Sequence, residues 1–551
     1  MIKHKHLLSR LNVYGLNVYG LNRFAQQQIS ALTQLSKRWF RNGPDGWAML
    51  PMLLVLMAIA APAAMAQEST GSISIADNIF QPIVDLLSIL LFFKIGGENG
   101  FPFIVLWLFV AAVFFTFRMG FINLRGLKHA IQVVQGKFDD PHDDGEVSHF
   151  QALATAVSGT VGLGNIAGVA IAIQLGGPGA MFWLTVAGLC GMVSKFVECT
   201  LAVKYRRRLP DGTILGGPMY YLNQGLAARG MRPVGQGLAV LFSILCLGGA
   251  LGGANMFQSN QAYAAISGLV PGLPAWLFGF VLAALAAFVI IGGIKRIGSV
   301  AEKLVPAMAV LYILACLTVI ITNFTQVPSA IGTIVSEAFV PKAAVGGFIG
   351  VMVQGIRRSS FSNEAGVGSA AIAHSAARTD EPVREGLVSL LEPLIDTVII
   401  CNLTAISIVL TGAYLDTGTE LSGVEMTASA FGSVVSWFPI VLSIAVCLFA
   451  FSTIVSWSYY GIQAWTYLFG ERSALLFKII YVVCTFLGCL TSLSVIIDFS
   501  DLLLLGMAFP NLLGCYILSN EVADDLSDYW NRLTSGQMVM VEASVPVSTD
   551  P

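Results

Sequence analysis

The chain has 551 residues, of which 56% are hydrophobic and only 11% carry a charge, and its mean hydropathy is +0.75. Soluble domains contain roughly 25% charged residues, so this composition excludes an ordinary soluble protein and predicts one that crosses a membrane several times. The formal net charge of -2 shows no basic excess, which argues against binding to nucleic acid.

The N-terminal region has the parts of a secretory signal peptide. Basic residues precede an apolar segment at 47–66, which ends in Ala-Met-Ala just before Gln67. The alternative is a first membrane helix that is not cleaved. In both interpretations the flanking charge places residue 67 on the outer side of the membrane.

Eleven apolar segments follow, each long enough to cross roughly 30 Å of hydrocarbon. We predict membrane spans at 101–121, 150–175, 178–202, 236–265, 274–293, 305–323, 344–372, 387–411, 434–465, 476–494 and 498–519. Lysine and arginine gather in every second connection, and such residues favour the cytoplasmic side. The basic connections are 118–137, 204–208, 295–303, 378–384 and 472–478, and the C-terminus lies on the same side.

Two short glycine-rich segments, at 158–165 and at 362–369, have similar sequences and stand 204 positions apart. Glycine costs roughly 1 kcal/mol against alanine inside a helix, so alternating glycines at membrane depth predict a broken helix. Opened backbone in a bilayer must be buried in protein or line a cavity, and a matched pair of broken helices indicates the binding site of a transporter. The alternative is close packing of small residues against neighbouring helices.

The position of the two segments predicts an internal repeat. Without the span at 101–121, ten spans remain, and they divide into two sets of five in which each set begins with a broken helix. Because five is odd, the second set is inserted upside down relative to the first, which is an inverted repeat. The predicted parts are an extension at 1–66, an extra membrane helix and cytoplasmic loop at 67–145, repeats at 146–343 and 344–520, and a cytoplasmic tail at 521–551.

A broken helix presents free N–H groups on one side of the break and free C=O groups on the other. A small zwitterion such as an amino acid suits this arrangement, because its carboxylate can meet the amides around residues 161–164. Gly162 and Gly164 let a ligand approach the backbone closely, and Asn165 adds a side-chain amide.

Polar residues on other predicted helices could complete a site. Asn255 and Gln258 share a helical face, and so do Thr453 and Trp457. The hydroxyls of Thr453 and its neighbour Ser452 suit a hard cation such as sodium. The alternatives are hydrogen bonds between helices for the amides and back-bonding to the helix for the hydroxyls.

Ionisable residues at membrane depth are costly, so each is a functional candidate that needs a partner. We expect Lys195 to pair with Glu198, three residues later in the same helix. Two further groups are Arg357, Arg358 and Glu364, which could form a gate or a structural ion pair, and Glu392 and Asp396, which could relay protons or bind arginines.

The sequence gives little support for an enzymatic function. None of the six histidines forms a metal-binding pair within a helix, and there is no nucleotide-binding loop of the Walker type. The nine cysteines stand singly, without zinc or redox spacing. We therefore predict no catalytic residue and no cofactor, and transport must draw on an ion gradient or be passive.

Seven motifs together resemble the alanine or glycine:cation symporters, the sodium:alanine symporter family. They are Phe-Gln-Ala-Leu at 150–153, Gly-Leu-Gly-Asn-Ile-Ala-Gly-Val-Ala at 162–170, Gly-Gly-Pro-Gly-Ala at 176–180, Gly-Gly-Pro-Met-Tyr at 216–220, Gly-Gly-Ile-Lys at 292–295, Phe-Ser-Asn-Glu-Ala-Gly at 361–366 and Trp-Ser-Tyr-Tyr-Gly at 457–461. The resemblance covers roughly residues 100–520. It implies the leucine-transporter architecture, with two inverted five-helix repeats and one extra N-terminal helix.

The resemblance also implies sodium-coupled uptake of small neutral amino acids, chiefly alanine and glycine, across a bacterial-type inner membrane. The implied substrate residues, together with the close-approach glycines, are Thr160, Gly162, Gly164, Asn165, Asn255, Gln258, Phe361, Thr453 and Trp457. The implied sodium ligands are carbonyls near Ser158 and Val161 and the hydroxyls of Ser452 and Thr453. A proton-coupled symporter and a substrate sensor on a transporter scaffold remain alternatives.

Overall fold

The computed structural model describes residues 88–97, 100–140, 142–339, 347–415, 423–490 and 493–538, and leaves out the side chains of 493–501. The described residues belong to one unit of the chain, which runs from Leu56 to Pro551. The signal-like segment at 47–66 lies outside the described residues, so its interpretation stays a prediction.

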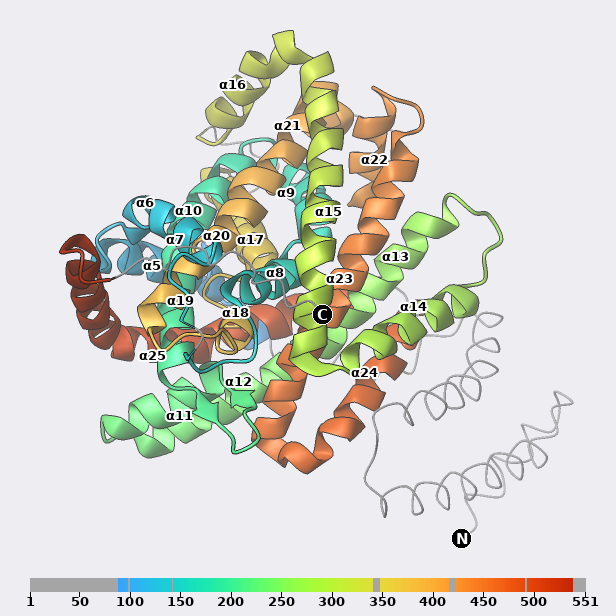
Figure 1. Cartoon of the computed structure of the whole chain (residues 1–551). Helices are drawn as coiled ribbons and strands as arrows, with labels where there is room; N and C mark the ends of the chain where they lie inside the picture. The colour runs from blue at the N-terminus through green and yellow to red at the C-terminus, as the bar shows by residue number, and fades with distance from the viewer. Residues whose placement is uncertain are drawn as a thin grey trace, which may run out of the picture. The chain divides into compact units, whose positions relative to one another are not determined.

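The described part of the chain is almost entirely helical (Figure 1). In its first half the helices are α5 (Phe103–Arg118), α6 (Ile122–Arg125), α7 (Leu127–Val134), α8 (His149–Thr160), η3 (Gly164–Gly168), α9 (Val169–Gly176), α10 (Ala180–Lys204), α11 (Pro218–Ala228), α12 (Arg232–Leu251), η4 (Gly252–Met256), α13 (Phe257–Ser267), α14 (Ala275–Ile290), α15 (Gly293–Thr322), η5 (Phe324–Gln326) and α16 (Val327–Glu337).

In the second half they are α17 (Gly347–Asn363), α18 (Ala370–His374), α19 (Pro382–Ser389), α20 (Leu391–Pro393), η7 (Leu394–Cys401), α21 (Asn402–Thr411), η8 (Ala413–Leu415), α22 (Val424–Gly432), α23 (Phe438–Phe469), η9 (Glu471–Ser473), α24 (Ala474–Gly488) and α25 (Leu493–Thr534). Two short antiparallel pairs complete the described elements, β1 (Lys94–Ile95) with β2 (Phe101–Pro102) and β3 (Arg207–Arg208) with β4 (Ile214–Leu215).

The helices confirm an integral membrane protein with several spans. Six described helical segments are long and apolar enough to cross a membrane, or seven if the bent pair of α8 with η3 and α9 counts as one span. The helices α5 and α14 are shorter and also apolar. Each of the eleven predicted segments overlaps a helix. The number of spans and the repeat boundaries stay predictions.

Both glycine-rich segments interrupt helices, as the sequence predicts. A capping box begins α8, where Ser148 and Gln151 exchange hydrogen bonds of 3.2 Å between side chain and backbone. The helix ends at Thr160, and the chain turns by 51° before η3 and α9 continue. The second break follows α17, where Gly366 and Gly368 have φ of 87° and 91°, a conformation that favours glycine.

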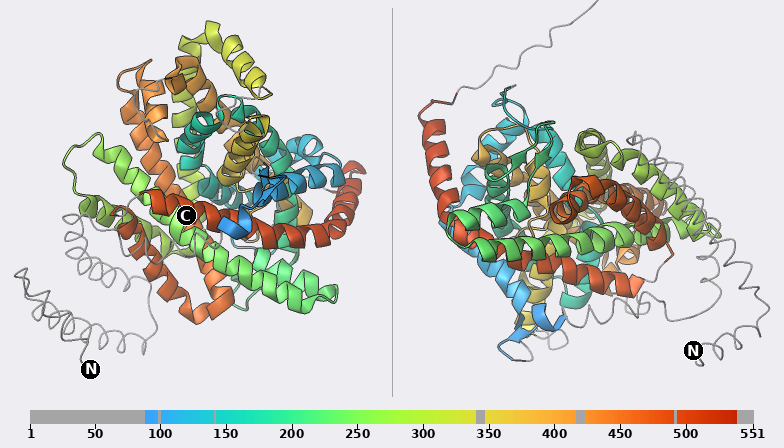
Figure 2. Two further views of the ribbon diagram at one scale, coloured as in Figure 1. Left: turned by 180° about the vertical axis from the view of Figure 1, so that it is seen from behind. Right: turned by 90° about the horizontal axis from the view of Figure 1, so that it is seen from below.

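The two broken helices lie against each other at the centre of the helix packing. The helix α8 packs on α18, α23 and α15, while η3 packs on α17. The largely buried helix α10 packs on α17 and α19, and it supports the second broken helix from behind. Figure 2 shows α25 lying alongside α12, and the contacts between these two helices agree. This packing places both breaks inside the protein.

Candidate functional site

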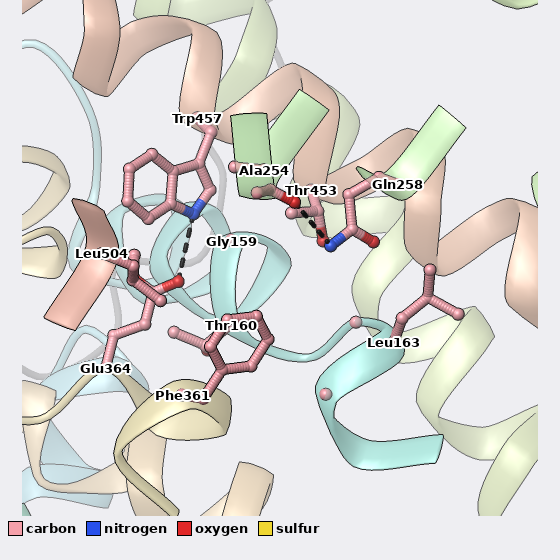
Figure 3. Close-up of a pocket in the computed structure, with 13 residues that line it drawn as sticks. Gly159, Thr160, Leu163, Ala254, Gln258, Phe361, Glu364, Thr453, Trp457 and Leu504 are labelled. Carbon is pink, nitrogen blue, oxygen red and sulfur yellow. Dashed lines mark hydrogen bonds between the residues drawn. The ribbon is translucent and has the colours of Figure 1, made fainter. Parts of the chain in front are cut away.

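A small cavity lies between the two helix breaks (Figure 3). Its volume, counted as the space open to the centre of a water molecule, is about 30 Å³. Residues of α8 and its break, η4, α13, α17 and its break, α23 and α25 form the wall. They are Gly159, Thr160, Gly162, Leu163, Gly164, Gly253, Ala254, Gln258, Phe361, Glu364, Thr453, Trp457 and Leu504. The cavity therefore lies where opened backbone was expected to line a binding site.

Glycine residues allow the first break and its neighbouring helices to lie close together around this cavity. A Cβ atom at Gly162 would lie 2.9 Å from Oγ1 of Thr453, and one at Gly164 would lie 3.3 Å from Cα of Ser362. Any larger residue would therefore push the first break away from α23 or from α17. Gly162 and Gly164 let the first break contact both helices.

Seven of the nine predicted substrate residues line the cavity. They are Thr160, Gly162, Gly164, Gln258, Phe361, Thr453 and Trp457. Asn165 and Asn255 are not among the lining residues. Asn255 instead donates a hydrogen bond of 2.8 Å from Nδ2 to the carbonyl oxygen of Tyr481 in α24.

Asn165 ties the first break to the π-helical segment η7. Its Oδ1 accepts a hydrogen bond of 2.8 Å from the N–H of Gly162, and its Nδ2 donates to Oδ1 of Asp396 at 2.6 Å. The same carboxylate accepts hydrogen bonds from Ser362 and Thr397 at 2.8 and 2.7 Å. Asn165 therefore shapes the break that borders the cavity.

Two polar side chains on the wall differ in whether they have a partner. The Oε1 atom of Gln258 is buried and has no hydrogen-bond partner within the described residues, while its Nε2 donates to the carbonyl of Gly253 at 3.2 Å. A buried acceptor without a partner is costly, so a ligand donor in the cavity would stabilise it. Trp457 donates from Nε1 to Oε1 of Glu364 at 3.2 Å, as Figure 3 shows.

Glu364 lines the cavity but is not among the predicted substrate residues. It follows α17 with a φ of 54°, which is unusual for a residue with a side chain. Its carboxylate accepts hydrogen bonds from Trp457 and from Ser369. The sequence marks Glu364 as an ionisable residue at membrane depth, but the turn that aims it at the cavity depends on the three-dimensional packing.

The predicted sodium ligands lie together beside the cavity. The carbonyl oxygen of Ser158 accepts hydrogen bonds from Thr453 Oγ1 at 3.1 Å and from Ser452 Oγ at 3.4 Å. The Ser158 hydroxyl in turn donates to the carbonyl of Ser452 at 2.9 Å. Val161 is fully buried at the end of the same helix. Neutral hydroxyl and carbonyl oxygens of this kind suit a hard monovalent cation.

Among the residues that the structure describes, no cluster of histidine, cysteine, aspartate and glutamate is arranged to hold a metal ion.

The expected pairing of Lys195 with Glu198 is wrong. Lys195 Nζ forms an ion pair of 2.9 Å with Glu392 Oε1, and both side chains are fully buried. Glu198 accepts a hydrogen bond from Asn511 at 2.7 Å instead. Because α10 is surrounded by other helices, its charged side chains reach partners on neighbouring elements rather than each other.

The two arginines before the second break contact aromatic rings. The Arg358 guanidinium lies 5.7 Å from the ring centre of the cavity residue Phe361, and that of Arg357 lies 5.0 Å from the ring of Phe92. These cation–π contacts fix the guanidinium groups on ring faces. Whether the arginines act as a gate stays open.

The chain is similar to known proteins over most of its length. The model of the sodium:alanine symporter family matches residues 94–543. Sodium/alanine symporter AgcS of Methanococcus maripaludis is 40% identical over 426 residues, which cover 77% of this chain and 93% of that protein. Probable sodium/glutamine symporter GlnT of Bacillus subtilis is 36% identical over 463 residues, which cover 84% and 93%.

A solved structure, that of MhsT in complex with L-phenylalanine, aligns with a TM-score of 0.49 at 18% identity and covers 71% of this chain and 95% of that chain. The family and the named relatives are symporters, so the protein is a transporter and not an enzyme. With a family match over most of its length, the chain belongs to the sodium:alanine symporter family.

Proposed function

We propose that the protein couples sodium influx to the uptake of a small neutral amino acid, alanine or glycine, by alternating access across a bacterial-type inner membrane. The observation that carries this proposal is the buried cavity between two helix breaks, with the predicted cation ligands directly beside it. The names of the relatives, a sodium/alanine and a sodium/glutamine symporter, support sodium as the coupling ion and an amino acid as the substrate.

The substrate in this proposal lies along the first break. The amide of Gly162 is already bonded to Asn165, so the amides of Leu163 and Gly164 are the proposed donors to the substrate carboxylate. The substrate ammonium group would lie toward Oε1 of Gln258, which lacks a partner within the described residues. The small cavity and the nearby ring of Trp457 favour a substrate with a short side chain.

Sodium would bind the carbonyl oxygens of Ser158 and Val161 and the hydroxyl oxygens of Ser452 and Thr453. Thr453 both lines the cavity and contacts Ser158, so one residue belongs to the two proposed sites. A bound cation would fix the end of α8 and with it the break that binds the substrate. Reciprocal linkage then requires the substrate to raise sodium affinity by the same factor.

The inverted five-plus-five repeat with α5 as the extra N-terminal helix is the architecture that we propose for this cycle. Two helix breaks at corresponding positions of the two halves support it, because transporters with inverted repeats bind substrate at such paired breaks. Alternating access would then move the two sets of helices against each other around the cavity.

A second candidate is proton coupling through Asp396. Its carboxylate is fully buried, and no lysine, arginine or histidine among the described residues forms an ion pair with it. A buried carboxylate without a basic partner is stabilised by binding a proton. Glu392 is less suited to this role because it is paired with Lys195.

Uptake of radiolabelled alanine into proteoliposomes tests these alternatives. Inward gradients of sodium, potassium or protons are imposed in turn, and we expect uptake with the sodium gradient alone. Uptake that is driven only by the proton gradient, and that is lost in the variant Asp396→Asn, would show that protons and not sodium are the coupling ion. Uptake that is insensitive to every gradient would overturn the proposed coupling of transport to an ion. Absence of alanine counterflow would show that the protein binds alanine without moving it, as a sensor does.

A further inference from the structure

A row of acidic and basic side chains, none of which lines the cavity or belongs to the predicted sodium ligands, runs from the surface into the interior of the described structure. In order along the row they are Asp139, His149, Glu385, His374, Glu392 and Lys195. Acid and base alternate at every step. The row starts at Asp139, whose side chain is 48% exposed, and ends at the fully buried Lys195.

His374 stands between two carboxylates. Its Nδ1 lies 2.5 Å from Oε1 of Glu385, and its Nε2 lies 3.8 Å from Oε2 of Glu392. Within the described residues neither His374 Nε2 nor Glu392 Oε2 has a hydrogen-bond partner. A neutral imidazole has one N–H group, whereas the imidazolium form has one on each nitrogen. Only the imidazolium form therefore offers a donor to both carboxylates.

Charge balance leads to the same form. Lys195, Glu392, His374 and Glu385 are all fully buried. With a neutral His374 these four residues carry a net charge of -1, and with an imidazolium they are neutral. Lys195 balances Glu392, so Glu385 takes its counter-charge from the two histidines that contact it, His374 and His149. A proton on His374 leaves these four side chains without an unbalanced buried charge.

The charged groups that surround this position come from four helices and from the connection after α10. Glu385 belongs to α19, Glu392 to α20, Lys195 to α10 and His149 to α8, and Arg206, just after α10, is within electrostatic range of Glu385. The guanidinium group of Arg206 donates hydrogen bonds to backbone carbonyl oxygens, among them those of Ala377 and Thr379. Its charge is thus shared among backbone acceptors rather than placed on the carboxylate beside His374.

His129 shows what burial does without carboxylates. This histidine in α7 is buried and hydrogen-bonded to the hydroxyl of Tyr529 at 2.7 Å. Burial lowers the pKa of His129, because the charged imidazolium loses its hydration. Burial alone therefore disfavours a proton on a histidine, and the two carboxylates beside His374 act in the opposite direction.

We propose that His374 is a proton-binding site, separate from the proposed sodium site, that links α18 to α19 and α20. Its route to solvent is the shared carboxylate of Glu385 and then His149, whose Nε2 lies 3.7 Å from Oδ1 of the half-exposed Asp139. Asp139 lies just after the connection predicted to be cytoplasmic, so the site exchanges its proton with that side. The imidazolium stabilises this packing at low pH, and the stabilisation is lost as the pH rises through the titration of His374.

The test is nuclear magnetic resonance of the purified full chain in detergent, with ¹⁵N-labelled histidine, between pH 6 and pH 10. An ordinary histidine, with a pKa of about 6.5, is almost entirely neutral at about pH 8. We expect one imidazole signal to remain doubly protonated there and to vanish in His374→Gln. His142→Gln removes an exposed imidazole and must leave that signal in place.

Two variants keep His374 and test its neighbours, which guards against misfolding of His374→Gln. Glu385→Gln and Glu392→Gln should each lower the midpoint of the retained signal by about one pH unit, a tenfold weaker proton binding. A His374 signal that is neutral at pH 8, or a midpoint that neither variant moves, would overturn the proposal. Sodium-driven alanine uptake by the same preparations is measured separately, so failure of the transport proposal is recognised independently of the titration.

Discussion

Thr453 belongs to both of the proposed sites. Its hydroxyl donates to the carbonyl of Ser158 in the proposed cation site, and the same residue lines the cavity. The sequence places Thr453 and Trp457 on one helical face, and both line the cavity. The contact with Ser158, 295 positions away, follows from packing that no local pattern reveals.

Replacing Thr453 by valine removes this hydroxyl at nearly constant volume. We expect the sodium concentration for half-maximal alanine uptake to rise roughly tenfold, since one oxygen ligand of the cation is lost. Thr485→Val is the matched control, because its hydroxyl donates to the carbonyl of Tyr481 within α24. An unchanged sodium dependence in Thr453→Val would remove Thr453 from the cation site.

Gly162→Ala tests the close approach of the first break to α23. The added Cβ would lie 2.9 Å from Thr453 Oγ1, so the break must move, and alanine uptake should fall about tenfold or more. Gly168→Ala is the control in the same broken helix, because its added Cβ meets no atom within 4 Å. Equal uptake by the two variants would contradict the role of Gly162.

At the scale of elements, the breaks could be predicted but the orientation of their neighbours could not. Alternating glycines mark both interruptions of the helices. Asn255 and Gln258 were expected on one face because they are three residues apart, yet only Gln258 reaches the cavity. The π-helical segment η4 contains Asn255 and inserts extra residues per turn, which turns Asn255 toward α24. Sequence periodicity assumes a regular α-helix and misses this rotation.

The second break depends on glycines with positive φ. Gly368 has a φ of 91°, and a Cβ there would lie 2.9 Å from the side chain of Asn511. We expect Gly368→Ala to destabilise the purified protein by roughly 2 kcal/mol, seen as a lower Tm. Gly237→Ala in α12 meets open space and should keep or slightly raise the Tm. A Tm loss of the same size in both variants would contradict this account of the break.

At the scale of the whole molecule, buried ion pairs join distant parts of the chain. Lys195 and Glu392 are 197 positions apart, and the sequence suggested a local partner for Lys195 instead. The histidines were set aside because none forms a metal-binding pair within a helix. His149 and His374 nevertheless meet at Glu385, since folding brings α8 and α18 to the same side of α19. Long-range pairing of charges is set by tertiary packing, which spacing does not encode.

The Lys195–Glu392 pair can be tested by a double-mutant cycle. Lys195→Met removes the ammonium group that lies 2.9 Å from the buried carboxylate of Glu392 and should cost about 3–5 kcal/mol of stability. The double variant Lys195→Met with Glu392→Gln should recover a large part of that loss, measured by thermal unfolding in detergent. Additive losses in the double variant would show that the two side chains do not stabilise each other.

In the proposed transport cycle, one broken helix couples the sodium and alanine sites. Equilibrium binding to the purified protein tests it most directly, by titrating alanine with and without saturating sodium and sodium with and without saturating alanine. We expect each ligand to raise the affinity of the protein for the other ligand by the same factor. Alanine binding that is independent of sodium would contradict it.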